Sequence, residues 1–142
     1  MKLRDIMSKE IASLKAADSV EQAAQLMKQY NIGSVPICNQ NSVVGIVTDR
    51  DIALRSVARG QERNQEIKDI MTANPVVGTP DMDVHEAVKI MSEKQIRRLP
   101  VVENNKLVGM VALGDISLEP KLQDNAEVAL KNISKPDANR FS

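Results

Sequence analysis

Aromatic residues are nearly missing from this chain. Its 142 residues include no tryptophan, and Tyr30 and Phe141 are the only other aromatic side chains. Proteins that bind single-stranded nucleic acid usually stack the bases on aromatic rings. The composition therefore argues against that class, and it predicts a core built from aliphatic side chains and methionine.

Excess charge, long apolar runs and paired cysteines are missing as well. Nineteen basic residues balance nineteen acidic ones, so no basic patch for duplex binding is expected. The longest apolar stretch, Leu107–Gly114, is too short to cross a bilayer, and the first ten residues lack the apolar segment of a secretory signal. The single cysteine, Cys38, cannot form an intrachain disulfide. We therefore expect a cytoplasmic protein that contacts neither nucleic acid nor a membrane.

The sequence does contain one unit written twice. Residues 3–52 and 67–116 align without a gap at an offset of 64, and fourteen of the fifty aligned pairs are identical. Such a match indicates that one unit was duplicated, so the fold is expected to consist of two copies of that unit. A unit of about 60 residues is marginal by itself, which favours two repeats that share a core.

Each repeat shows the same order of local patterns. A short apolar run opens it, at residues 11–14 and 76–77. Apolar residues at helical spacing follow: Val20, Ala23, Ala24 and Met27 in the first repeat, and Val84, Ala87, Val88 and Met91 in the second. The pairs Ser19 with Gln22 and Asp83 with Glu86 have the spacing of a capping box at the helix start.

Two β-rich runs separated by a polar turn come next in each repeat. Residues 35–38 with 43–47, and 99–102 with 107–111, predict hairpins. A second helix is expected over 49–59, ending at Gly60. The fold class is thus α/β of the α+β kind, with two β-α-β-β-α repeats. The polar tail carries a short helix over about 125–133, stopped before Pro136, and residues 137–142 are expected to fray.

Three paired motifs carry a resemblance to a known family. They are LRDIM with IKDIM, SVPIC with RLPVV, and VVGIVTDRD with LVGMVALGD. In this order and duplication they resemble tandem cystathionine-β-synthase (CBS) domains, a stand-alone Bateman module packed as a pseudo-two-fold pair. The resemblance covers residues 3–118. It divides the chain into a first CBS domain at 1–62, a second at 63–120 and a tail at 121–142.

The resemblance implies a regulatory module rather than an enzyme. CBS pairs bind adenosine-containing ligands in clefts between the repeats: AMP, ADP, ATP, S-adenosylmethionine, NAD or cyclic dinucleotides. They report that binding to a protein partner, which the sequence does not identify, and two modules commonly form a homodimer. An energy or metabolite sensor is therefore expected, with no required cofactor and no metal.

The family's ribose-binding position falls on Asp51 in the first repeat and on Asp115 in the second. A carboxylate can accept hydrogen bonds from both ribose hydroxyls, while the Thr48 hydroxyl could meet phosphate oxygens. The second repeat has Ala112 in place of that threonine, so we expect the Asp51 site to bind better. The candidate binding residues are Ile11, Ser34, Val35, Pro36, Thr48, Arg50 and Asp51 in the first repeat, and Val77, Arg98, Leu99, Pro100 and Asp115 in the second.

Each candidate also has an ordinary structural explanation. Thr48 and Asp51 have the spacing of a capping pair that needs no ligand, and Val35 and Leu99 fit simple core packing. The arginines that could hold phosphate, Arg98 and then Arg97, Arg50 and Arg55, could equally be solvated surface charges. If these explanations hold, the module is a ligand-free dimerisation or protein-interaction scaffold. His85 is the only histidine, so a metal cluster is not expected.

Overall fold

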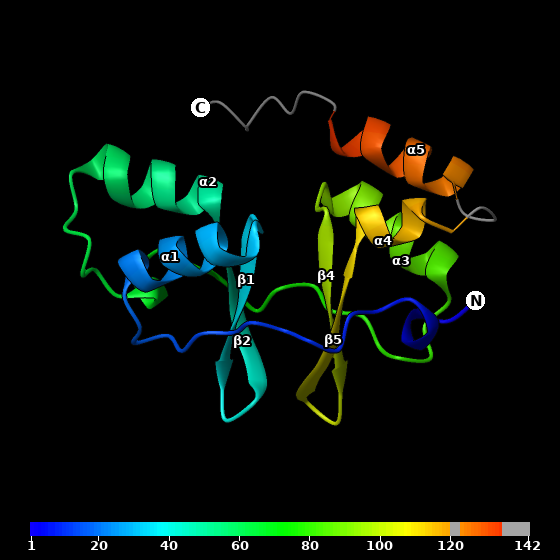
Figure 1. Ribbon diagram of the computed structural model, residues 1–142, viewed down its shortest axis with the longest axis horizontal. Helices are drawn as coiled ribbons and strands as arrows, with labels where there is room; N and C mark the ends of the chain where they lie inside the picture. Colours follow the sequence, from blue (N-terminus) through cyan, green and yellow to red (C-terminus); the bar gives the residue numbers. More distant parts are fainter. Residues whose placement is uncertain (120–122, 135–142) are drawn as a thin grey trace. The chain divides into compact units, whose positions relative to one another are not determined.

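Two β-hairpins form the sheets of the molecule, and the computed structural model describes residues 1–119 and 123–134 (Figure 1). The first hairpin joins β1 (Ser34–Asn39) to β2 (Ser42–Thr48), and the second joins β4 (Arg98–Glu103) to β5 (Lys106–Ala112). Each has a two-residue turn in the left-handed region: Gln40 and Asn41 at φ 51° and 69°, and Asn104 and Asn105 at 52° and 63°. This geometry suits the twist of antiparallel strands, and it confirms both predicted hairpins.

The first helix of each repeat begins and ends at equivalent positions, α1 at Val20–Tyr30 and α3 at Val84–Lys94. The predicted capping box forms at α1, where the Gln22 amide donates to Ser19 Oγ at 3.1 Å and the Ser19 amide donates to Gln22 Oε1 at 2.8 Å. At α3 the prediction was wrong in detail, because Asp83 caps the helix by accepting from the amide of His85 at 2.8 Å instead of pairing with Glu86.

Two further expectations about these segments are corrected. Ala24 was placed on the buried face of its helix but is exposed, whereas its counterpart Val88 is 6% exposed. The apolar runs that open the repeats are not strands: the first makes only one isolated parallel bridge, from Leu14 to Ile37, and next to the second only Gly78 makes one, to Val101. A single bridge leaves the rest of the run as loop.

The second helix of the first repeat is confirmed in extent but changes its winding along its length. It runs as α2 (Asp49–Asp51), a π-helical turn η2 (Ile52–Ser56) and a 3₁₀ turn η3 (Val57–Arg59). Gly60 follows at φ +70° and ends it, as expected. π-helical turns in such helices are uncommon and often lie at functional sites.

The second repeat replaces that long helix with two shorter ones. They are α4 (Leu113–Ser117) and α5 (Gln123–Ile133), the latter confirming the helix expected in the tail. Helix α5 packs on α3 and α4 (Figure 1), with Ala126, Ala129 and Ile133 buried. The fraying expected at 137–142 lies outside the described residues. No helix of residues 1–119 and 123–134 has both the length and the apolar character that crossing a bilayer requires.

The compact units of the structure interleave the two sequence repeats. Unit 1 comprises Met1–Lys9, Val77–Val101 and Val108–Ser142, and unit 2 comprises Glu10–Val76 and Val102–Leu107. The opening segment of each repeat thus lies in the unit that holds the helices of the other repeat. The division at 62 and 120 stays a prediction about the sequence repeats.

In unit 1 the N-terminal segment is fixed by backbone hydrogen bonds to the residues before α3. The Leu3 amide donates to the Met82 carbonyl at 3.0 Å, the Arg4 amide to the Pro80 carbonyl at 3.1 Å, and the Val84 amide to the Met1 carbonyl at 2.9 Å. Leu3 itself, in η1 (Leu3–Asp5), is fully buried. The N-terminal segment is therefore part of the core of unit 1.

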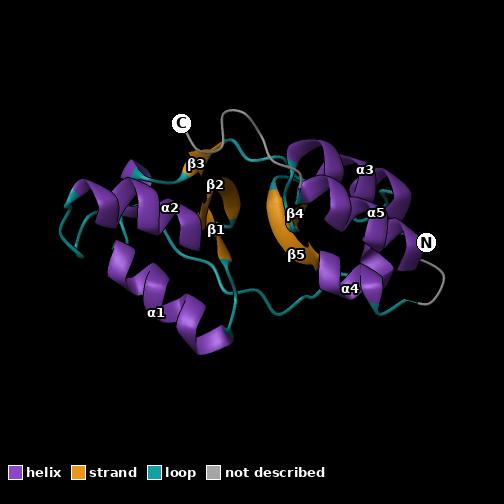
Figure 2. Ribbon diagram, turned by 90° about the horizontal axis from the view of Figure 1, so that it is seen from above, coloured by secondary structure: helices purple, strands orange, loops and turns teal. Residues whose placement is uncertain are grey.

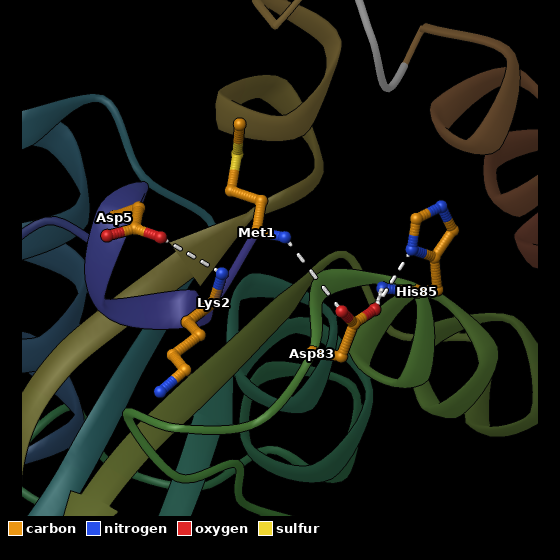
Figure 3. A network of polar contacts seen from close by, with 5 residues as sticks. All are labelled: Met1, Lys2, Asp5, Asp83 and His85. Carbon is orange, nitrogen blue, oxygen red and sulfur yellow. Dashed lines mark hydrogen bonds and ion pairs between the residues drawn. The ribbon is translucent and has the colours of Figure 1, made fainter.

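Polar contacts at the surface accompany this docking (Figure 3). The Asp5 carboxylate accepts from the Lys2 amide at 3.0 Å, which caps η1. Asp83 accepts from the amide and the ring Nδ1 of His85 at 2.8 and 2.9 Å, and it lies 3.9 Å from the amino group of Met1. The amide of His85, followed by its ring, lowers the pKa of the Asp83 carboxyl, so the cap stays ionised around neutral pH.

Unit 2 shows the same arrangement with the segment after the polar linker at residues 61–66. The Ile67 amide donates to the Asp18 carbonyl at 2.9 Å, the Lys68 amide to the Ala16 carbonyl at 3.0 Å, and the Val20 amide to the Gln65 carbonyl at 2.8 Å. Ile67, at the start of η4 (Ile67–Asp69), is fully buried. The following strand β3 (Thr72–Ala73) pairs with β2, as Figure 2 shows. The opening segment of the second repeat therefore completes the sheet of the first.

Two glycines on the hairpins make room for these opening segments, and replacing them should destabilise the fold. A Cβ at Gly45 would lie 2.5 Å from Met71 Sδ and 3.0 Å from the Thr72 carbonyl oxygen, and one at Gly109 would lie 2.9 Å from Met7 Cγ. We expect Gly45→Ala and Gly109→Ala each to lower the free energy of unfolding by about 1–3 kcal/mol in urea titrations, because the core would be overpacked.

Gly114→Ala is the matched control for these two substitutions. Gly114 lies within α4, its φ is not positive, and a Cβ there meets nothing within 4 Å. Alanine should therefore stabilise the chain by up to about 1 kcal/mol through its higher helix propensity. Equal losses at all three glycines would contradict the role assigned to Met7 and Met71.

Candidate functional site

Polar side chains of the first repeat meet where the hairpin joins the second helix. Ser34 begins β1 and Thr48 ends β2, and the two residues are register partners in the antiparallel pair. Asp51 follows within the first turn of α2. All three residues were predicted for the site, and unit 2 contains all of them.

Thr48 and Asp51 hold each other through a reciprocal pair of hydrogen bonds. The Asp51 amide donates to Thr48 Oγ1 at 3.0 Å, and the Thr48 amide donates to Asp51 Oδ2 at 2.9 Å. This is a capping box, so the capping explanation of the motif is confirmed as geometry. The capping box uses Oδ2 of the Asp51 carboxylate, so Oδ1 can accept hydrogen bonds from other groups. Arg55 Nε lies 3.9 Å from this oxygen.

The second repeat builds half of the same arrangement. The Ala112 amide donates to Asp115 Oδ2 at 3.0 Å, as the Thr48 amide does to Asp51. Alanine offers no hydroxyl in return, so the reciprocal bond cannot form. Asp115 is thus presented like Asp51, but with one polar group fewer beside it, as the sequence indicated.

A backbone contact that the sequence analysis missed fixes the start of each second helix. The Asp49 amide donates to the Gly33 carbonyl at 2.9 Å, and the Leu113 amide donates to the Arg97 carbonyl at 2.9 Å. These bonds tie the residue before β1 or β4 to the first helical residue after β2 or β5. Backbone carbonyls carry no side-chain signal, so only the equivalence of positions 33 and 97 could have suggested them.

Four of the remaining candidates are too buried for their side chains to contact a ligand, whereas Arg98 at the start of β4 is only partly buried. Val35 and Leu99 are fully buried, which agrees with the core-packing alternative. Pro36 and Pro100 are also buried, and their carbonyls accept from the amides of Leu14 and Gly78 at 3.2 and 2.8 Å. The candidates Ile11 and Val77 lie partly buried in the loops that lead to those amides, and Arg50 is exposed on α2.

Ser34 is the exception among the buried candidates. It is 9% exposed, and its hydroxyl has no hydrogen-bond partner among residues 1–119 and 123–134. Leaving a buried hydroxyl unpaired costs about 1–3 kcal/mol, and such groups are few in native proteins. The Ser34 hydroxyl is therefore a polar group available to a ligand next to Thr48.

Metal and thiol chemistry find no support in the part of the chain that the structure describes. No group of three or more histidine, cysteine, aspartate or glutamate side chains there could hold a metal ion. Burial raises the pKa of the Cys38 thiol, although a hydrogen bond with Ser13 opposes the shift. A buried, protonated thiol behaves as a small apolar side chain.

Comparison with family models decides the classification. The model described as "CBS domain" matches residues 3–57 and again residues 67–119. The chain belongs to the CBS domain family. Its two matches coincide with the two sequence repeats, so the tandem CBS arrangement and the α+β fold are confirmed.

Individual relatives agree with this assignment. The CBS domain-containing protein YhcV of Bacillus subtilis is 40% identical over 132 residues, which cover 93% of this chain and 94% of that protein. The CBS domain pair of protein MJ0100, solved in complex with 5′-methylthioadenosine and S-adenosyl-L-methionine, is 32% identical, with a TM-score of 0.75 over 83% of this chain and 94% of that one. The CBS domain protein PAE2072 from Pyrobaculum aerophilum superposes with a TM-score of 0.79 over 91% and 98% of the two chains, but at 24% identity this shows the fold alone.

Proposed function

We propose that this CBS pair is a regulatory module that binds an adenosyl ligand beside Ser34, Thr48 and Asp51. The buried hydroxyl of Ser34, which finds no hydrogen-bond partner in the described part of the chain, carries the proposal, because a ligand would supply the missing bond. The related MJ0100 pair, which holds two adenosyl compounds, supports the choice of ligand class. The proposal assigns no catalytic step to the chain.

The three side chains offer complementary hydrogen-bonding groups. Asp51 Oδ2 is taken by the Thr48 amide, so Oδ1 would accept from ribose hydroxyls. Thr48 Oγ1 accepts from the Asp51 amide and keeps its own proton to donate, and the Ser34 hydroxyl can donate or accept. Such a set suits a ligand with neighbouring hydroxyls and further polar oxygens, as in a nucleoside.

Holding the base without tryptophan or phenylalanine sets the expected affinity. Neither repeat contains tryptophan or phenylalanine, so aliphatic groups and backbone amides would contact the adenine. Binding would then be modest and reversible, which a sensor of adenine nucleotides or S-adenosylmethionine requires. A homodimer, a protein partner that responds to the ligand and a cytoplasmic location complete the proposal.

Thermal unfolding with a panel of ligands tests this function. A ligand at 100 times its Kd should stabilise the chain by about 2.7 kcal/mol, which for this size is a rise in Tm of about 5–10 °C. AMP, ADP, ATP, NAD, S-adenosylmethionine and 5′-methylthioadenosine form the panel, and inosine monophosphate at the same concentrations is the control for the adenine base.

A scaffold without a ligand is the second candidate, because the Thr48–Asp51 capping box explains that motif completely without one. In that case no adenosine compound raises Tm, while sedimentation still shows a stable dimer. A rise with adenosine compounds that inosine monophosphate does not reproduce supports the sensor and excludes the scaffold.

A further inference from the structure

Arg55 lies in the π-helical turn η2 and reaches two groups outside that turn. Its Nη1 donates to the carbonyl oxygen of Ile70 at 3.2 Å, and its Nε lies 3.9 Å from Asp51 Oδ1. The side chain of Arg55 is 47% exposed, whereas that of Asp51 is only 13% exposed. One guanidinium therefore joins the candidate site to a backbone atom of the segment that follows the linker.

The two oxygens of Asp51 are consequently held by different partners. Oδ2 accepts from the Thr48 amide, and Oδ1 faces Arg55. The guanidinium is planar and rigid, so fixing one of its nitrogens on a carbonyl also fixes the direction of the others. Ile70, which supplies that carbonyl, is 1% exposed and belongs to the core of unit 2, so the anchor is firm.

The second repeat lacks this arrangement and reverses the charge. At the offset of 64, Glu119 takes the place of Arg55. Asp115 keeps its bond to the Ala112 amide, but the residue four positions later is an anion that lies beyond the end of α4, so no cation there can pair with Asp115. Only the first repeat, which has the complete Thr48–Asp51 capping box, carries a cation at this position. An ordinary ion pair on a helix surface does not account for that coincidence.

We propose that Arg55 is a positioning residue of the Asp51 site: its guanidinium, anchored on the Ile70 carbonyl, aligns the carboxylate for the ribose. This inference rests on the proposed function and adds a residue to it. Arg55 acts on the ligand through Asp51, so its contribution does not depend on whether the ligand carries phosphate.

Calorimetric titration of Arg55→Gln with adenosine and with AMP tests the role. We expect the affinity for both probes to fall by the same factor, about threefold to fivefold, which corresponds to a partly exposed ion pair. Combined with Asp51→Asn, the Arg55→Gln change should weaken binding no further. Arg59→Gln, one turn along on η3, is the matched control and should bind like the wild type.

Other outcomes overturn the role. A loss for AMP but not for adenosine would show that Arg55 contacts phosphate, and a loss that persists in the Asp51→Asn background would show that it acts independently of Asp51. Unfolding without ligand provides a separate arm with Asp51→Ala, which removes both carboxylate contacts; the Tm losses of Arg55→Gln and Asp51→Ala should be less than additive. Additive losses reject the contact. If the wild type binds no member of the adenosine ligand panel, the proposed function fails, while this arm still decides whether Arg55 holds Asp51.

Discussion

Leu3→Ala should lower the stability of unit 1 by about 2–5 kcal/mol, although residue 3 belongs to the first sequence repeat. Leu3 is fully buried, and its Cδ1 packs so closely on Gly78 that a Cβ there would lie 2.8 Å away. Truncation to alanine leaves a cavity beside Gly78 and Leu99. The backbone hydrogen bonds that fix the N-terminal segment keep the chain from moving in to fill it. Ile67→Ala should have the same effect on unit 2, because Ile67 is equally buried.

Native-state hydrogen exchange identifies which unit each substitution loosens. Leu3→Ala should speed the exchange of amides in α3 and in residues 98–101 of β4, which belong to unit 1, more than that of amides in α1 and β1. Ile67→Ala should do the opposite. Leu118→Ala, at a position 80% exposed, is the control and should change stability by less than about 0.5 kcal/mol. If Leu3→Ala loosens α1 and β1 first, the interleaved division into units is wrong.

Local patterns were sufficient to predict the helices and hairpins of this fold. The ends of α1 and α3 follow from apolar spacing and capping residues, and the two hairpins follow from β-rich runs around Asn-containing turns. Interleaving could not be predicted in the same way. The motifs LRDIM and IKDIM are interchangeable in sequence, and only long-range hydrogen bonds, such as those from Leu3 to Met82 and from Ile67 to Asp18, assign each to a unit.

The candidate site shows the same limit. The spacing of Thr48 and Asp51 predicted both a binding pair and a capping pair, and the structure confirms the cap without testing the ligand. Arg55 was expected at most to hold phosphate, because helical spacing alone cannot show that it reaches the Ile70 carbonyl from a π-helical turn. That the Ser34 hydroxyl finds no partner within residues 1–119 and 123–134 is likewise a property of packing.

Asp51→Asn should weaken the binding of adenosine and AMP by about 2–3 kcal/mol, roughly 30- to 150-fold. The amide oxygen of asparagine can still accept from the Thr48 amide, which keeps the cap at the start of α2. The group that then faces the ribose is an NH₂ donor in place of the charged acceptor Oδ1. The Tm without ligand should therefore change little, and isothermal titration should show the loss of affinity.

Asp115→Asn is the matched variant in the second repeat, and it should reduce affinity less. Ala112 gives the Asp115 site no hydroxyl, and Glu119 stands where Arg55 supports Asp51. If Asp115→Asn removes binding while Asp51→Asn leaves it unchanged, the order of the two sites is reversed. If both variants bind as tightly as the wild type, neither carboxylate receives the ribose, and the two aspartates act only as backbone caps. The difference between the two variants thus measures how far the duplicated halves have diverged in function.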